Sequence, residues 1–384
     1  MTPFFASILL AATATVACGD AAPAAKPVDL AICLDTSGSM NGLIDSARQK
    51  IWSIVNDLAL ARPTPRLRVA LLTFGNDGHR AEAGWVNVDC PFTEDLDLVS
   101  QRLFALTTNG GTEYVGRVVR VAVDQLDWSS GSGALKILVV AGNESADQDP
   151  EVPFRDASRL AISRDVVVNS IYCGNGADNL APAWREVATL ADGRFASIDQ
   201  NGTVAVPSPF DADIAKLGTD LNGTYLANGK AGLEGCSNQT VQDQNAASLN
   251  TAAAAGRAAS KASALYRCSW DLVDACRDEA FDLATVKEED LPEEMRKMTL
   301  GERKAHVEKK RLEREAIQMK IADLAAKRNA FVAEEMKKSA NEGDRAFDLA
   351  VRSAIRAQAE AKGFRFEAEA AVVSSTEESR TGSR

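Results

Sequence analysis

Histidine is scarce in this chain, and its scarcity limits the catalytic chemistry available. The 384 residues include two histidines, His79 and His306. His79 falls in a turn-rich segment and His306 in a stretch dense in charged residues, which favours a mobile surface side chain in both cases. Without a histidine beside a serine or cysteine, a nucleophile has no evident base. A non-enzymatic protein is therefore expected, and a hydrolase with an unrecognised site is the weaker alternative.

Nucleotide-binding signatures and long apolar runs are also missing. No Gly-x-Gly-x-x-Gly follows the first predicted strand, and no Walker A sequence occurs, which argues against the phosphate-binding loops of nucleotide-binding proteins. Beyond the N-terminus, no apolar run approaches the roughly 20 residues that a membrane-spanning helix needs. The net charge of -11 disfavours binding to nucleic acid or to an anionic membrane surface, because both attract clustered cations.

The N-terminus resembles a secretion signal, although no Lys or Arg precedes its apolar part. An apolar stretch from residue 4 to 16 is followed by small residues up to residue 25. Residues 1–25 are therefore expected to direct export across the inner membrane to the periplasm or cell envelope. Thr15-Val16-Ala17-Cys18 resembles a bacterial lipoprotein box, which would attach Cys18 to lipid. Plain cleavage between residues 20 and 25 is the alternative.

Cysteine usage is compatible with an oxidising compartment. Six of the seven cysteines follow Cys18, and an even number permits disulfides without fixing their pairing. The spacings do not fit a zinc site. Cys33 lies in a predicted core strand, where a small buried thiol is expected. Cys173 ends another strand, and without a positioned histidine a buried or disulfide-bonded thiol is favoured over a nucleophile.

Residues 28–200 alternate between short apolar runs and amphipathic segments. The runs are rich in aliphatic residues, which is typical of strands buried on both faces of a parallel sheet. The amphipathic segments carry apolar residues at helical spacing. This alternation predicts an α/β fold with a doubly wound, mostly parallel sheet. The expected strands are 28–34, 67–74, 85–88, 135–141, 166–172 and 194–198, and the expected helices are 42–60, 94–106, 114–126, 154–163 and 182–190.

The remainder of the chain changes in composition. Residues 201–264 are rich in Gly, Asn and Ala and are expected to form a linker and an extension draped over the first domain. Residues 265–365 predict a charged α-helical region, because apolar residues recur at helical spacing among many Glu, Lys and Arg. The heptad pattern is not sustained, which favours a helical hairpin over a free coiled coil. The tail, 366–384, lacks periodicity and is expected to be disordered.

Small polar residues follow the first predicted strand. Asp35, Ser37 and Ser39 occupy alternate positions of a short loop, at the end where open α/β sheets bind their ligands. Their carboxylate and hydroxyl oxygens can converge on one point, and such hard ligands suit Mg²⁺. An ordinary strand-to-helix turn, with Ser39 or Asn41 as the helix N-cap, is the alternative interpretation.

The stretch Asp35-Thr36-Ser37-Gly38-Ser39 resembles the Asp-x-Ser-x-Ser motif of von Willebrand factor A domains, where it opens the metal-ion-dependent adhesion site. The resemblance covers residues 28–200 and implies the Rossmann-like sheet of that family. A second loop of the family supplies a threonine, and Gly110-Gly111-Thr112 matches this loop. The alternative role for Thr112 is a helix N-cap before Tyr114, which is compatible with metal contact.

The third loop departs from the family pattern. Family members carry an Asp there, which often contacts the metal through water, whereas this chain has Ala141-Gly142-Asn143-Glu144. Asn143 and Glu144 both bring oxygens to this loop, and either is expected to substitute. This stretch, together with Cys90–Thr93 and Ile198–Gln200, is similar to segments of uncharacterised secreted bacterial proteins of the same class.

The resemblance implies a binding function. In the family, the metal keeps one coordination position open for a carboxylate of a partner protein. The implied ion is Mg²⁺, Mn²⁺ or Ca²⁺, and the implied ligands are Asp35, Ser37, Ser39, Thr112, Asn143 and Glu144. The expected protein is thus a secreted, non-enzymatic binding module with no small-molecule substrate and no nucleic-acid partner. The alternative is a degenerate, metal-free scaffold whose C-terminal helices mediate assembly.

Overall fold

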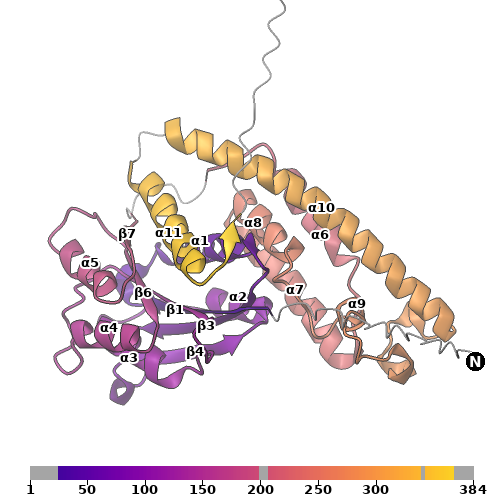
Figure 1. Cartoon of the computed structure of the whole chain (residues 1–384), viewed down its shortest axis with the longest axis horizontal. Helices are drawn as coiled ribbons and strands as arrows, with labels where there is room; N and C mark the ends of the chain where they lie inside the picture. The colour runs from indigo at the N-terminus through magenta and orange to yellow at the C-terminus, as the bar shows by residue number, and fades with distance from the viewer. Residues whose placement is uncertain (1–24, 199–205, 339–341, 367–384) are drawn as a thin grey trace, which may run out of the picture.

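The computed structural model describes residues 25–198, 206–338 and 342–366. Figure 1 shows an α/β domain with a helical region packed against it. Cys18 and nearly all of the segment that predicts export lie outside the described residues, as does all but the first residue of the tail for which disorder is expected. Within the described ranges, no helix is long and apolar enough to cross a membrane.

Six strands form the central sheet, in the order β4-β3-β1-β5-β6-β7. The parallel strands are β1 (Pro27–Asp35), β3 (Arg66–Phe74), β5 (Leu135–Gly142), β6 (Val167–Tyr172) and β7 (Phe195–Ser197). At one edge β4 (Val86–Thr93) pairs antiparallel with β3, and this strand is longer than predicted. β1 is buried from Val28 to Asp35, as its apolar sequence predicts for a central strand covered on both faces. The predicted mostly parallel sheet is confirmed.

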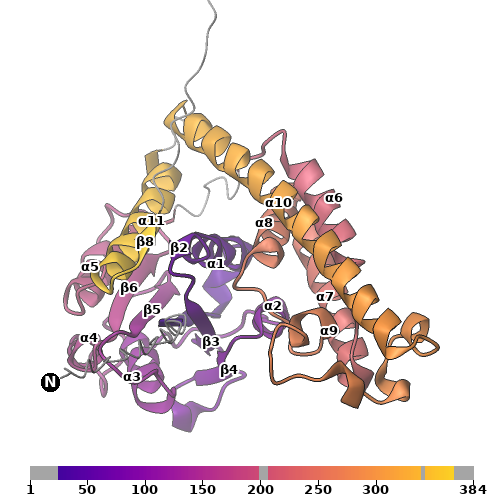
Figure 2. The ribbon, with the colours of Figure 1, turned by 45° about the vertical axis from the view of Figure 1, so that its right-hand side comes forward.

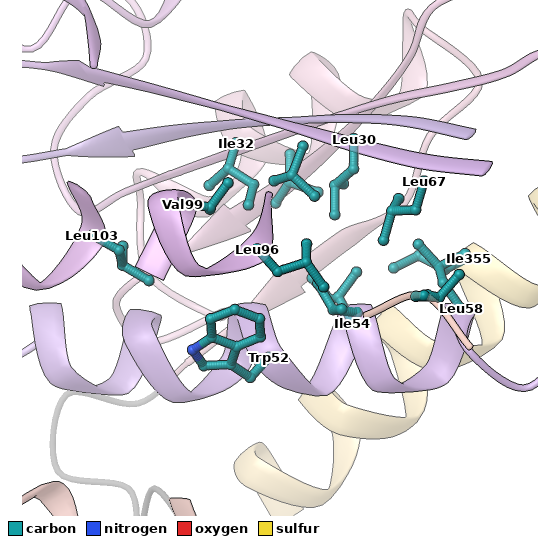
Figure 3. Close-up of a cluster of buried hydrophobic side chains, with 14 of the residues drawn as sticks. Leu30, Ile32, Trp52, Ile54, Leu58, Leu67, Leu96, Val99, Leu103 and Ile355 are labelled. Atoms are coloured by element: carbon teal, nitrogen blue, oxygen red, sulfur yellow. The ribbon is translucent and has the colours of Figure 1, made fainter. Parts of the chain in front are cut away.

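Helices cover both faces of this sheet, close to the predicted ranges. One face packs against α3 (Val115–Gln125), α4 (Phe154–Ser163) and α5 (Ala181–Thr189), and the other against α1 (Ile44–Leu58) and α2 (Leu96–Phe104). Figure 3 shows the second face, where Leu30 and Ile32 of β1 lie above Trp52 and Ile54 of α1. Because β1, β3 and β5 run parallel, the loops that follow these strands lie at the same edge of the sheet.

The last helix on this second face comes from the far end of the chain. α11 (Glu342–Ala361) packs against α1 and β7, and its Ile355 belongs to the same apolar cluster as Leu58 and Leu67 (Figure 3). Asn169 of β6 and Gln358 of α11 exchange two side-chain hydrogen bonds, of 3.1 and 2.9 Å. Beyond α11, β8 (Arg365–Phe366) pairs antiparallel with β2 (Ala61–Arg62). The α/β domain is therefore completed by two segments that are distant in sequence.

Between β7 and α11 the chain builds the helical region visible in Figure 2. Its main helices are α6 (Asp211–Asn222), α7 (Gly229–Leu249), α8 (Thr251–Ala262) and α10 (Leu300–Lys338). Residues 211–262, for which the sequence suggests a linker and an extension, are mostly helical. Their small residues serve close helix packing, because a Cβ on Gly218 of α6 would lie 2.6 Å from the Cβ of Ala258 in α8. The Gly- and Ala-rich composition thus reflects a helix–helix contact.

Residues 265–299 are less helical than predicted. They contain one short helix, α9 (Leu272–Ala275), and several single turns. The long charged segment that follows forms α10, which packs against α6, α8 and α9 of the same chain. Its Arg314 is 1% exposed and donates to Asp271 Oδ2 at 2.8 Å. A buried ion pair of this kind fixes where the helix docks, although its net contribution to stability is small.

The thiols that the structure describes are mostly buried. Cys33, Cys90 and Cys268 lie in apolar surroundings, and none of these three is bonded to another cysteine. Burial raises the pKa of the Cys33 thiol far above its usual range, because a thiolate there would lose its hydration. The prediction of Cys33 as a small buried residue is confirmed.

Candidate metal centre

Asp35 is the last residue of the central strand, with a strand on each side. In the parallel register Asp35 lies opposite Phe74 of β3, and Leu34 lies opposite Ala141 of β5. The next residue on each neighbouring strand is a glycine. A Cβ on Gly75 would lie 2.8 Å from Asp35 Oδ1, and a Cβ on Gly142 would lie 3.1 Å from Asp35 Oδ2. The two glycines therefore leave space on both sides of this carboxylate.

The Asp35 carboxylate is completely buried. Its Oδ1 accepts a hydrogen bond from the Ser37 N–H at 2.8 Å. Its Oδ2 has no partner with normal hydrogen-bond geometry among the described residues, although the Asn143 amide is close enough to influence its pKa. Burial raises the pKa of Asp35 to about 7, and the negative charge of Glu113 acts in the same direction. A buried carboxylate with one oxygen unsatisfied is costly unless a proton or a cation joins it.

Two serines and an asparagine form a chain of hydrogen bonds beside this carboxylate. Ser37 Oγ lies 2.9 Å from Ser39 Oγ, and Ser39 Oγ donates to Asn143 Oδ1 at 2.9 Å. The loop between β1 and α1 thus meets the loop after β5. Ser37 is buried and Ser39 is exposed, so the group extends from the sheet edge to solvent. Lone pairs of both hydroxyls remain available to a cation.

The N-cap interpretation of this loop is wrong. A short 3-10 turn, η1 (Gly38–Met40), follows Ser37, and α1 begins at Ile44 with Leu43 in the N-cap position. Neither Ser39 nor Asn41 caps the helix. The polar residues after β1 therefore have no role in starting α1, and their side chains face one another and the neighbouring loops.

The loop that carries Thr112 is fastened to the same edge by backbone contacts. Gly38 N donates to Gly110 O at 2.9 Å, and an isolated antiparallel bridge joins Gly75 to Thr112. α3 has Tyr114 in its N-cap position, so the alternative N-cap role for Thr112 is also wrong. The glycine match in this loop has a structural reason, because Gly110 adopts a φ of +87° while meeting Gly38.

Asn76 is a structural residue of the site that the sequence analysis missed. Its side chain is buried, and Nδ2 donates to Thr36 O at 3.2 Å and to Thr107 O at 2.9 Å. It thereby ties the Asp35 loop to the Thr112 loop from beneath. Its only signal in the sequence is a Gly-Asn-Asp-Gly turn, which indicates a turn and no long-range contact.

Two glutamates lie near the centre, in different environments. Glu113 is nearly fully buried, and its Oε2 accepts from Gln148 Nε2 at 2.7 Å. Glu144 is half-buried, and burial followed by the charge of Glu113 raises the pKa of its carboxyl. The Glu144 backbone carbonyl accepts from Trp184 Nε1 at 2.8 Å, which holds the third loop in place. Within the described part of the chain, no group of three His, Cys, Asp or Glu side chains could hold a metal ion, so any metal here depends on hydroxyl ligands as well.

Part of the chain matches a known protein family. Residues 29–205 match the sequence model of the von Willebrand factor type A domain. This segment is a von Willebrand factor type A domain. No curated protein matches the chain.

Several solved structures are similar to this domain. BatB from Bacteroides thetaiotaomicron is 16% identical, with a TM-score of 0.35, over 45% of this chain and 90% of that one. The SpRpn10 VWA domain is 14% identical, with a TM-score of 0.36, over 46% and 91%. Proximal thread matrix protein 1 of the mussel byssus, described with a zinc-occupied MIDAS motif, is 15% identical, with a TM-score of 0.36, over 46% and 43%. Von Willebrand A domains are in general non-enzymatic interaction modules, and many bind a divalent metal.

Proposed function

We propose that the chain is a secreted, non-enzymatic binding protein, whose von Willebrand A domain uses a divalent cation to bind a carboxylate of a partner protein. The observation that carries this proposal is Asp35 Oδ2, a buried oxygen beside Gly142 that has no hydrogen-bond partner of normal geometry among the described residues. A cation would satisfy this oxygen and would lie at the solvent-facing edge where Ser39 is exposed. An exposed cation at this edge would attract an anionic group of a partner.

The residues present fit a hard divalent ion. Asp35, Ser37, Ser39 and Thr112 would hold it, with Asn143 or Glu144 contributing from the third loop. All of these ligands are oxygens, which favours Mg²⁺, with Mn²⁺ or Ca²⁺ as alternatives. Export to the periplasm or cell envelope, with or without lipid at Cys18, is part of the proposal and rests on the sequence of residues 1–25.

The test is metal binding by calorimetry on the full chain. We expect saturable Mg²⁺ and Mn²⁺ binding that the double substitution Ser37→Ala/Ser39→Ala removes. Ser163→Ala is the matched control, because its Oγ donates to Leu160 O on an exposed surface and should leave binding unchanged. Equal binding by the wild type and the double variant would contradict the proposed site.

A metal-free scaffold is the second candidate function, and one observation favours it. Leu312 and Met319 lie two turns apart on α10 and are 53% and 69% exposed. Apolar side chains on one face of a long helix suit assembly with another chain. If calorimetry detects no metal, Leu312→Ser/Met319→Ser should lower the oligomeric state measured by light scattering, and an unchanged monomer would exclude this candidate.

A further inference from the structure

We propose that Glu113 supplies the second negative charge of the metal centre, in place of the aspartate that the third loop lacks. This inference rests on the proposed metal site and names a residue outside the motif that the sequence suggests. Glu113 follows the matched Thr112 directly, so the backbone that anchors Thr112 also positions Glu113.

The space beside Gly75 shows that Glu113 shares the site with Asp35. The position that a Cβ on Gly75 would occupy lies 2.8 Å from Asp35 Oδ1, 3.1 Å from Glu113 Cγ and 3.4 Å from Ser37 Cβ. Three side chains from two different loops therefore line one small space, which is kept open by a glycine with a φ of +81°. The two carboxyl groups are close enough for the charge of Glu113 to act on Asp35.

The partners of Glu113 leave its charge uncompensated. Its Oε2 accepts from the neutral amide of Gln148, and its own N–H donates to Gln148 Oε1 at 3.3 Å. The next arginine along the chain, Arg117 of α3, is held by Asp149 at 2.8 Å and by Glu151 at 2.9 Å. The position of Glu113 is thus fixed, and its buried carboxyl group lies close enough to Asp35 for the two to interact. Two adjacent buried carboxylates are costly unless protons or a cation lie between them.

Glu113 fits this role better than Glu144 does. Glu113 is 4% exposed, whereas Glu144 is half-buried. Among the described residues no group of three His, Cys, Asp or Glu side chains could hold a metal ion, so the centre would combine two carboxylates with serine and threonine hydroxyls. Two negative charges would balance a divalent ion. The third loop can then carry the neutral Asn143, because Glu113 of the second loop supplies the missing negative charge.

The test compares Glu113→Gln with the wild type in two measurements on the full chain. Glutamine keeps the size of the side chain and an oxygen that can accept from Gln148, but it removes the charge. We expect Mg²⁺ affinity measured by calorimetry to fall at least about tenfold. We also expect thermal unfolding in EDTA to occur at a higher temperature than in the wild type, because the substitution removes a buried charge that has no cation beside it. Glu82→Gln, which removes a largely exposed charge of the α/β domain, should change neither value.

The outcomes separate this inference from the proposed function. If the wild type and Glu113→Gln bind Mg²⁺ equally well, the inference is overturned and the metal site stands. If Glu113→Gln lowers the unfolding temperature in EDTA and keeps its affinity, Glu113 is a structural residue and the inference is overturned. If the wild type binds no Mg²⁺ or Mn²⁺ at millimolar concentration, the proposed function is overturned together with the inference.

Discussion

The return of the C-terminal helix to the sheet can be tested at Ile355. This side chain of α11 is 1% exposed and lies next to Leu58 of α1 in the apolar cluster below β1 (Figure 3). Ile355→Ala would remove three carbon atoms from this contact while keeping a good helix former. If α11 is part of the α/β domain, the substitution should destabilise the domain as a core substitution does.

The expected loss of stability in Ile355→Ala follows from the burial of this side chain. Each buried methylene or methyl group contributes about 0.8 kcal/mol, so three carbons account for about 2.4 kcal/mol before any cavity forms. Measured Ile→Ala costs in protein cores span about 2–5 kcal/mol. A crevice between α11 and the strands β6 and β7, lined in part by Val351 and Ile355, already leaves packing incomplete. We therefore expect a loss near the lower end, about 2–3 kcal/mol.

The assay is urea unfolding of the full chain, followed by tryptophan fluorescence. Four of the five tryptophans lie in the α/β domain, and of these Trp52 and Trp184 are buried on opposite faces of the sheet. Leu312→Ala on α10 is the matched control, because its side chain is largely exposed and should cost under about 0.5 kcal/mol. A cost at Ile355 no larger than that of the control would refute the conclusion that α11 is an integral layer of the domain.

Two further predictions concern charge. Because burial raises the pKa of Asp35 from 3.8 to about 7, the metal-free native state binds more protons than the unfolded state between these pH values. The free energy of unfolding, measured with urea in EDTA, should therefore fall by up to about 4 kcal/mol as the pH rises from 4 to 7. Asp35→Asn should largely remove this dependence on pH. If the variant shows the same dependence as the wild type, the buried Asp35 is not its cause. Arg314→Met, which leaves Asp271 buried without its cation, should cost about 3–5 kcal/mol in the same assay. Arg311→Met, on the exposed face of α10, should cost under about 1 kcal/mol, and equal costs would contradict a special role for Arg314.

The α/β half of the fold could be predicted because its signal is local. Strands such as β1 and β5 are near-continuous apolar runs, and helices such as α1 and α3 have an apolar face at helical spacing. Each of these elements was expected within a few residues of its observed bounds. The strand pair β2 and β8 was missed, because each has two residues and the pairing joins Ala61 to Phe366.

The helical region was harder to predict because its signal lies in tertiary contacts. Gly218 indicates a flexible segment in the sequence, whereas in the structure it allows α6 to approach α8 closely. Lys261 is 1% exposed, and its Nζ donates to Asp243 Oδ2 at 2.5 Å. A buried lysine at the end of an alanine-rich helix cannot be expected from composition, because lysine is almost never buried unless it is paired. Only the docked helices supply the partner.

The candidate site also combines residues that the sequence predicts with residues that only tertiary contacts bring together. Asp35, Ser37 and Ser39 follow one strand at fixed spacing, so the sequence alone brings them together. Asn143 joins them only because β5 lies beside β1 in the sheet. Glu113 and Asn76 carry no motif, since their positions depend on how the loops fold over the sheet edge. Sequence spacing therefore predicts which residues of one loop lie together. The structure is needed to show which residues of other loops join them and what charge they bring.

The order of segments along the chain limits how the von Willebrand A domain can be separated from the rest. The matched region ends at residue 205, but α11 covers the sheet from residues 342–361. A protein cut after residue 205 would expose the apolar surface around Leu58 and Leu67 that Ile355 and Phe364 cover. It would also leave Asp57, which is buried and paired with Arg356 at 2.6 Å, without its cation. The helical region between β7 and α11 is thus held at both ends by one domain, so any partner that it binds would be carried at a fixed position relative to the candidate metal centre.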